Sequence, residues 1–233
     1  MHEARPVAGG VAVYGTDRAR QKSRAPFHIT GSGTADDGSA PPPASNTGQG
    51  VPMKHNALYV TATGPLTGKS AIALGTMQML SRHMRNVAFF RPIINEPQLD
   101  DRDPDINLML EHFKIGMDYA DTFAYTHAEA REIINQGSRN LLLENIIQKF
   151  KKILLEHDFV LCVGTDFLGK DPIFEFELNA EIAANLGCPV MLVTSGDEAS
   201  SEEIRQSLQM TMDSLGPYSL DVVATIINRS HLS

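Results

Sequence analysis

Residues 57–70 read Ala57-Leu-Tyr-Val-Thr-Ala62-Thr63-Gly-Pro-Leu-Thr-Gly68-Lys69-Ser70, an apolar run that passes into a glycine-bearing loop. Apolar residues then recur at helical spacing from Ile72 to Met84. A strand, a loop and a helix in this order are the layout of a phosphate-binding P-loop, in which backbone N–H groups and the helix N-terminus attract phosphate oxygens. In that layout Lys69 contacts the outer phosphates and the Ser70 hydroxyl binds Mg²⁺.

The match to the P-loop pattern is incomplete, because the pattern has a glycine where this chain has Thr63, and Gly64 stands one place later. An ordinary Gly/Pro-rich turn with a solvated lysine is the alternative. The position of Gly68-Lys69-Ser70 between a strand and a helix favours the phosphate site. We therefore predict that ATP or another nucleotide, with Mg²⁺, binds at Thr63, Gly64, Thr67, Gly68, Lys69 and Ser70.

Residues 1–53 are rich in Gly, Ala, Ser, Pro and Thr and contain few large apolar side chains. Such a composition buries too little surface to offset the entropy of ordering, so we expect a disordered leader. Its longest apolar run, Val11–Tyr14, is too short for a secretory signal, and its acidic residues argue against a transit peptide. Met53 resembles a natural translation start. We assign residues 54–233 to one domain, possibly truncated at its C-terminal end.

Charge and hydropathy restrict the function classes. The formal net charge is −8 and the sequence pI is about 5.4, which argues against a nucleic-acid partner. No apolar run approaches the ~18 residues of a membrane span, so we expect no membrane partner. Cys162 and Cys188 lie in or beside apolar runs, which predicts buried, reduced thiols and a cytoplasmic protein.

Strand patterns and helix patterns alternate along residues 54–233. Continuous apolar runs such as Phe159–Val163 are typical of strands buried on both faces. The chain therefore predicts an α/β fold, a P-loop NTPase-like parallel sheet with helices on both faces. The expected strands are 57–62, 87–90, 159–163, 189–194 and 221–228, and the expected helices are 71–85, 103–110, 127–136, 138–156, 177–186 and 202–215.

In such folds ligands bind beyond the carboxyl ends of the strands. Asp166 follows the strand 159–163, where a carboxylate can hold Mg²⁺ or its water; a solvated loop acid or a helix cap is the alternative. Asn228 ends the last strand and offers both a donor and an acceptor to an adenine edge. An ordinary turn residue is the alternative for Asn228.

The chain resembles the N-terminal domain of the long, multidomain bacterial phosphate acetyltransferases, a domain that is itself similar to dethiobiotin synthetase. The likeness covers about residues 54–229, and its segments are specific as a set. They are Tyr59–Ser70, Phe90–Ile93, Asp121–Ala130, Asp158–Asp166, Phe174–Ala183 and Ile226–Arg229.

The full-length family converts acetyl-CoA and phosphate to acetyl phosphate and CoA, on a separate C-terminal domain. The resemblance therefore implies that this chain is a nucleotide- or metabolite-binding domain that regulates phosphate acetyltransferase and supports its assembly. It implies the catalytic domain as a partner and a homo-oligomer. We expect residues 1–233 to have no transacetylase activity and no catalytic residue of their own.

Comparison with dethiobiotin synthetase gives the metal site that the resemblance implies. Ser70 matches its P-loop hydroxyl and Asp105 roughly matches one acid, but Val163 stands where a glutamate is expected. Arg91 stands where a substrate-side lysine is expected, and arginine does not exchange freely for lysine. We predict Ser70, Asp105 and Asp166 as metal ligands. Two alternatives stay open: an ATP-dependent carboxylase or ligase of the dethiobiotin synthetase kind, and a structural domain with a vestigial P-loop.

Overall fold

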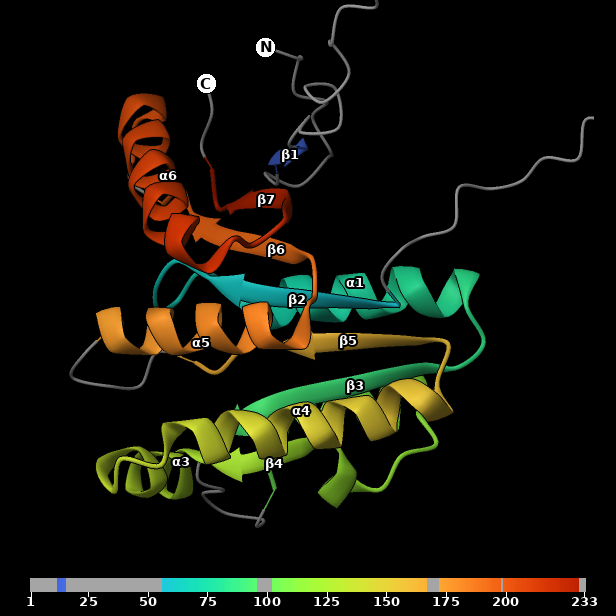
Figure 1. The fold of residues 1–233 in the computed structure, drawn as a ribbon. Coiled ribbons are helices and arrows are strands. Elements are labelled where there is room, and N and C mark those ends of the chain that lie inside the picture. The colour runs from blue at the N-terminus through green and yellow to red at the C-terminus, as the bar shows by residue number, and fades with distance from the viewer. Residues whose placement is uncertain (1–11, 16–55, 96–101, 167–171, 198, 231–233) are drawn as a thin grey trace, which may run out of the picture. The chain divides into compact units, whose positions relative to one another are not determined.

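The computed structural model of the chain describes residues 12–15, 56–95, 102–166, 172–197 and 199–230. Its centre is a seven-stranded sheet in the order β1-β7-β6-β2-β5-β3-β4 (Figure 1). Strands β2 to β7 pair in parallel, and β1 pairs antiparallel with β7. The parallel sheet places the carboxyl ends of β2, β3, β5, β6 and β7 along one edge.

The strands are β1 (Ala12–Gly15), β2 (Ala57–Ala62), β3 (Val87–Ile94), β4 (Phe123–Thr126), β5 (Phe159–Val163), β6 (Val190–Ser195) and β7 (Val222–Asn228). The helices are α1 (Lys69–His83), α2 (Pro104–Phe113), α3 (His127–Asn135), α4 (Arg139–Glu156), α5 (Pro172–Leu186) and α6 (Ser201–Leu215). Two short 3₁₀ helices are η2 (Tyr119–Asp121) and η3 (Gly216–Tyr218).

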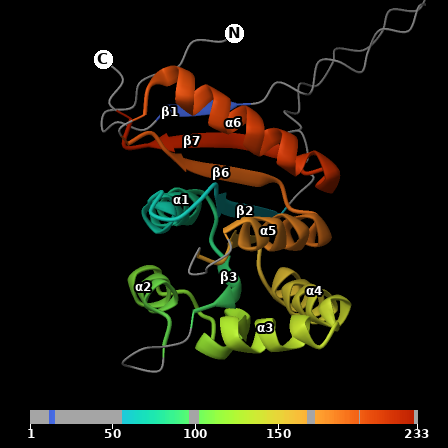
Figure 2. The same ribbon diagram turned by 90° about the vertical axis from the view of Figure 1, so that its left-hand side faces the viewer.

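Helices cover both faces of the sheet. Helices α1 and α2 lie on one face, and α3, α4 and α5 lie on the other (Figure 2). Because successive side chains of a strand point to opposite faces, neighbouring residues enter different cores. Tyr59 packs with α4 and α5 residues such as Leu142 and Leu178, whereas Val60 packs with α1 residues such as Met77. The predicted α/β class, with helices on both faces of a parallel sheet, is confirmed.

Two elements differ from their predicted bounds by four or more residues, and β4 was not predicted. Strand β3 continues four residues beyond Phe90, through Arg91-Pro92, because β4 pairs with it there and because the buried Arg91 charge is neutralised by carboxylates. Strand β4 was not predicted, since its four residues are all half-buried and show no alternation. Helix α5 begins at Pro172, five residues before its expected start.

The edge strand β1 lies within the predicted leader. Ala12–Gly15 pair with Ala224–Ile227 of β7. The predicted leader thus contains one short strand, and the Val11-Ala-Val-Tyr14 run has the β-branched and aromatic side chains that favour strands. The rest of the predicted leader lies outside the described residues.

Two expectations about burial can be compared with the structure. Cys162 and Cys188 are both buried free thiols, as the sequence predicts. No helix among the described residues is long and apolar enough to cross a membrane.

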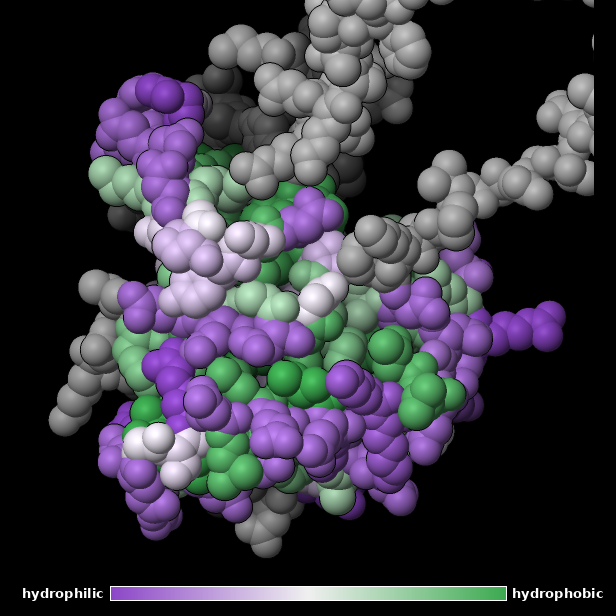
Figure 3. All heavy atoms as spheres, in the orientation of Figure 1, coloured by the Kyte–Doolittle hydropathy of each residue, from purple (hydrophilic) through white to green (hydrophobic). Residues whose placement is uncertain are grey.

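The surface over α4 and α5 is largely hydrophilic, with hydrophobic side chains between the polar ones (Figure 3).

Candidate functional site

The P-loop connects the end of β2 to the start of α1. Gly68 has a φ of 81° and stands at the N-cap of α1, and Leu66 also adopts a left-handed conformation with a φ of 55°. A left-handed leucine is strained, and such strain is concentrated at functional sites. The loop surrounds a cleft of about 400 Å³. The cleft is lined by Ala62, Gly64, Pro65, Leu66, Thr67, Gly68, Lys69, Ser70, Asn95, Asp166 and Arg229.

Lys69, the predicted phosphate ligand, lies in the wall of this cleft and is 5% exposed. Its ammonium group donates to the carbonyls of Gly164 and Thr165, the latter at 2.9 Å, and pairs with an Asp166 oxygen at 2.8 Å. Burial lowers the pKa of Lys69 from its ordinary value, and the Asp166 carboxylate opposes that shift. The lysine is therefore held by the loop that follows β5.

A hydrogen-bond network fixes the loop after β5. The Asn179 side chain of α5 accepts from the Thr165 N–H at 2.9 Å and from the Tyr59 hydroxyl at 3.0 Å. A Cβ atom on Gly164 would lie 2.4 Å from the same amide oxygen, so only glycine fits there. Strand β2 and helix α5 together hold the carbonyls that bind Lys69.

Arg91 of β3 is 1% exposed and lies among three carboxylates. One terminal nitrogen donates to both Asp103 oxygens at 3.0 Å and to Asp105 at 3.1 Å, and the other donates to Asp166 at 2.7 Å. Burial disfavours the guanidinium charge, but the carboxylates outweigh this effect and raise the pKa of Arg91. Arg91 therefore links the end of β3, the start of α2 and the end of β5.

Asp166 accepts from both cations of the site. Burial raises the pKa of its carboxyl, but Lys69 and Arg91 outweigh this and lower the pKa from 3.8 to about 2. The side chain is 33% exposed and lines the cleft. Asp166 is therefore a charged carboxylate at neutral pH, not an isolated solvated loop acid.

The three predicted metal ligands lie close together, and each already binds another ligand or a cation of the site. The Ser70 hydroxyl donates to an Asp105 oxygen at 2.7 Å, and that oxygen also accepts from Arg91. Both Asp166 oxygens accept from Lys69 or Arg91. Among the described residues no group of three or more His, Cys, Asp or Glu residues could hold a metal ion. The arrangement does not fit the predicted Mg²⁺ site.

Asn228 contacts the P-loop itself. Its amide nitrogen donates to the Thr67 carbonyl at 2.9 Å, and its amide oxygen accepts from the Arg229 N–H at 3.0 Å. A Cβ atom on Gly68 would lie 2.2 Å from the amide nitrogen. Asn228 therefore holds the P-loop in this structure, and its contact with an adenine edge stays a prediction.

Thr63 faces away from the cleft. Its hydroxyl donates to the Thr194 hydroxyl of β6 at 3.0 Å, and its N–H donates to the Val193 carbonyl. Thr67 is buried below the loop and offers its carbonyl to Asn228. Of the predicted phosphate ligands, Gly64, Thr67, Gly68, Lys69 and Ser70 line the cleft and Thr63 supports it.

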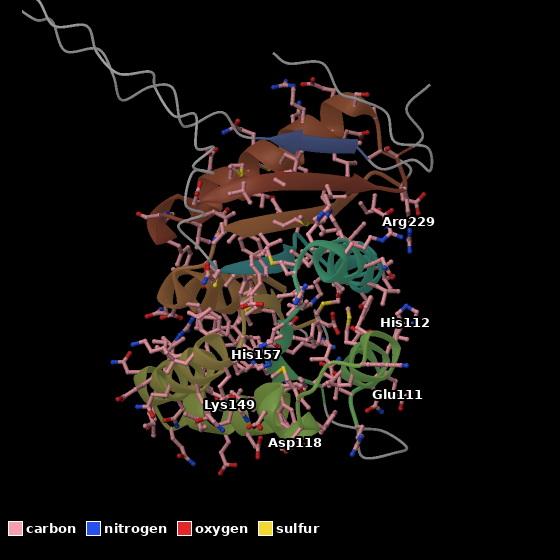
Figure 4. All side chains as sticks on the ribbon, turned by 90° about the vertical axis from the view of Figure 1, so that its right-hand side faces the viewer. Glu111, His112, Asp118, Lys149, His157 and Arg229 are labelled. Atoms are coloured by element: carbon pink, nitrogen blue, oxygen red, sulfur yellow. The ribbon has the colours of Figure 1, made fainter. Side chains whose placement is uncertain are left out.

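Three residues of the site were not assigned from the sequence. Asn95 and Arg229 line the cleft, and Figure 4 shows Arg229 at the end of β7. Asp103 is a buried partner of Arg91 and also caps α2 by accepting from the Ile106 N–H at 3.1 Å. The Asp103-Pro104 pair signals a helix start, but no local pattern indicates the second role of Asp103.

A separate cavity of about 160 Å³ lies between η2 and α4. Asp118, Lys149 and His157 line it and lie near one another in Figure 4. Lys149 donates to the Ala120 carbonyl at 2.5 Å and lies over the Phe123 ring. Acidic and basic side chains are mixed around this cavity, so we assign no functional site to it.

A P-loop at the carboxyl edge of a parallel sheet, with helices on both faces, defines a P-loop NTPase-like α/β domain. Residues 56–231 match the protein family described as "AAA domain", and the chain belongs to this family.

Curated relatives include larger enzymes. The chain is 57% identical over 175 residues to a phosphate acetyltransferase of Nitratidesulfovibrio vulgaris, a match that covers 75% of this chain and 25% of the relative. It is 34% identical over 174 residues to a phosphate acetyltransferase of Synechocystis sp., with the same coverage. The chain thus spans about a quarter of the length of these relatives. It is also 26% identical over 148 residues to an ATP-dependent dethiobiotin synthetase of a Sulfurovum species, covering 60% of this chain and 69% of the relative.

Solved structures with a related arrangement share little sequence. The BceF tyrosine kinase domain has a TM-score of 0.43 and 16% identity, covering 74% of this chain and 68% of that one. A GTPase from Pyrococcus abyssi in its apo form has a TM-score of 0.43 and 13% identity, covering 71% and 64%.

Proposed function

We propose that this chain is a P-loop domain that binds a nucleotide or another phosphorylated metabolite and thereby regulates, or supports the assembly of, a phosphate acetyltransferase. The observation that carries the proposal is the formed P-loop cleft, which Gly68, Lys69 and Ser70 line together at the start of α1. A helix N-terminus with a lysine beside it attracts phosphate. The likeness to two phosphate acetyltransferases supports the link to that enzyme.

Binding without turnover is the expected behaviour. Val163 is a fully buried apolar residue at the position where the resemblance to dethiobiotin synthetase implies a metal-binding glutamate. Arg91 is bound to carboxylates and has no exposed surface to offer a second substrate. On this proposal the domain binds phosphate but lacks one metal-binding acid and the substrate-side lysine of that reaction.

The test is calorimetric titration of the full chain with ATP, ADP, NADH, pyruvate and CoA, followed by an assay for ADP release. Saturable binding of a phosphorylated compound without ADP release is the expected result. A domain with a vestigial P-loop would bind none of them. Inhibition or activation of a co-expressed phosphate acetyltransferase catalytic domain by the bound compound tests the regulatory role, and co-purification tests the assembly role.

An ATP-dependent ligase is the second candidate, because the match to the Sulfurovum dethiobiotin synthetase covers 69% of that enzyme. This candidate predicts ADP release that an amine and bicarbonate together stimulate. Ser70 and Asp105 are both present for it, and Val163 counts against it. Stimulated ADP release that is lost in Lys69→Ala would favour the ligase over the binding domain.

A further inference from the structure

Arg91 stands at the centre of the acidic cluster beside the P-loop. Its guanidinium contacts three carboxylates from two segments: Asp103 and Asp105 at the start of α2, and Asp166 in the loop after β5. It reaches all three at 2.7–3.1 Å and is almost completely buried. Arg91 thereby connects the start of α2 to the loop after β5, the two segments whose carboxylates lie near the P-loop hydroxyl of Ser70.

Carboxylate oxygens near a P-loop hydroxyl are the groups that would bind Mg²⁺. Here Asp105 accepts from both Ser70 and Arg91, and Asp166 accepts from both Lys69 and Arg91. The three carboxylates Asp103, Asp105 and Asp166 face two cations, so most of the negative charge is already neutralised. A dication bound by these carboxylates would compete with Arg91 for them, and removing one partner from a buried ion pair is strongly unfavourable.

We propose that the guanidinium of Arg91 takes the place of a divalent cation in this P-loop, so that phosphate-bearing ligands bind the cleft without Mg²⁺. The inference about ligands rests on the proposed function. Lys69, the Ser70 hydroxyl and the backbone N–H groups then supply the contacts to phosphate oxygens. The site selects a free polyphosphate or phosphomonoester over its Mg²⁺ complex, because both oxygens of Asp166 and one oxygen of Asp105 already bind Lys69, Arg91 or Ser70.

The first experiment titrates wild-type protein with ATP and with inorganic pyrophosphate, in EDTA and in excess MgCl₂. Affinity that is equal in the two buffers, or tighter in EDTA, is expected. A loss of about tenfold or more on removing Mg²⁺, equivalent to about 1.4 kcal/mol, would overturn the inference while leaving the proposed function intact.

A second experiment needs no ligand, so it separates the two proposals. Thermal melting is measured in EDTA and in MgCl₂ for wild type, Arg91→Gln and the control Arg205→Gln, which removes an exposed arginine of α6 paired with Glu202. Mg²⁺ should leave wild type and the control unchanged. It should raise the melting temperature of Arg91→Gln, because that variant leaves Asp103 and Asp105 without a cation and Asp166 with Lys69 alone.

Each outcome of the melting experiment decides one question. Stabilisation of wild type by Mg²⁺, or the absence of Mg²⁺ stabilisation in a folded Arg91→Gln, contradicts the role of Arg91. If Arg91→Gln does not fold, Arg91→Lys replaces it; lysine keeps the charge but lacks the planar fork that binds carboxylates bidentately, so a smaller rise with Mg²⁺ is expected. If wild type binds neither ATP nor pyrophosphate in either buffer, the proposed function fails, and the melting comparison still tests Arg91.

Discussion

The ammonium nitrogen of Lys69 lies 2.8 Å from a carboxylate oxygen of Asp166, so the P-loop lysine is paired within the protein. This contact joins the first residue of α1 to the loop after β5. A phosphate that enters the cleft must either contact Lys69 alongside Asp166 or displace Asp166 from Lys69. The ion pair therefore couples the phosphate site to the Arg91 cluster, since Asp166 also binds Arg91.

Replacing Lys69 by alanine should weaken ATP binding by about ten- to a hundredfold. The reason is the loss of a charge-assisted contact to phosphate, worth roughly 1.5–3 kcal/mol. Calorimetric titration measures the change, and a melting curve confirms that the variant is folded. Lys151→Ala is the matched control, because Lys151 is an exposed lysine of α4. Equal affinity in wild type and Lys69→Ala would exclude Lys69 from the phosphate site.

Gly68 and Asn228 should show coupled effects on stability. Asn228→Ala removes the hydrogen bond to Thr67 and should cost about 0.5–1.5 kcal/mol. Gly68→Ala places a Cβ atom 2.2 Å from the Asn228 amide at a φ of +81°, where a left-handed alanine alone costs roughly 1–2 kcal/mol. The double variant removes the clash, so it should lose less than the sum of the single variants. Denaturant unfolding of all four proteins gives the coupling, and simple additivity would contradict the close contact.

The contribution of Asp166 to stability should depend on pH in the acid range. Its folded-state pKa is lowered from 3.8 to about 2 by Lys69 and Arg91. Because the pKa of Asp166 is lower in the folded state, its ionised carboxylate stabilises the folded protein fully above pH 3.8. That stabilisation is lost as the pH falls towards about 2. The difference in unfolding free energy between wild type and Asp166→Asn should therefore shrink over this window. A difference that stays constant across it would show that Asp166 does not carry the ion pairs.

Strand β1 should contribute to stability although it lies in the predicted leader. Deleting residues 1–15 removes four cross-strand pairs with β7, which at roughly 0.2–1 kcal/mol each should lower the free energy of unfolding by about 1–4 kcal/mol. It also exposes an unpaired strand edge, which promotes association between copies. Deletion of residues 1–10 keeps β1 and serves as the control. Identical melting of both deletion variants and wild type would argue against the β1–β7 pairing.

The two thiols should react only when the protein unfolds. Burial raises the pKa of the Cys162 thiol well above its ordinary value, and the neighbouring Cys188 adds to that shift. The thiolate is the reactive form, so a thiol reagent should label native protein slowly and denatured protein quickly. Rapid labelling of both cysteines in native protein would contradict their burial.

Local patterns in the sequence determined the P-loop, the helix and strand alternation and the parallel sheet. The apolar run Phe159–Val163 predicts a fully buried strand, and Gly187 ends α5 in the left-handed conformation that glycine adopts freely. These features depend on residues close together in the chain. They are therefore visible without a structure.

Tertiary structure decided what each polar residue of the site does. Arg91 contacts Asp103, 12 residues away, and Asp166, 75 residues away, and Asn228 reaches Thr67 across 161 residues. No local pattern specifies such pairs, because the sheet order brings separate loops to one edge only after folding. The sequence predicts Asp105 and Asp166 as metal ligands, whereas in the fold one oxygen of each carboxylate accepts from the buried guanidinium of Arg91.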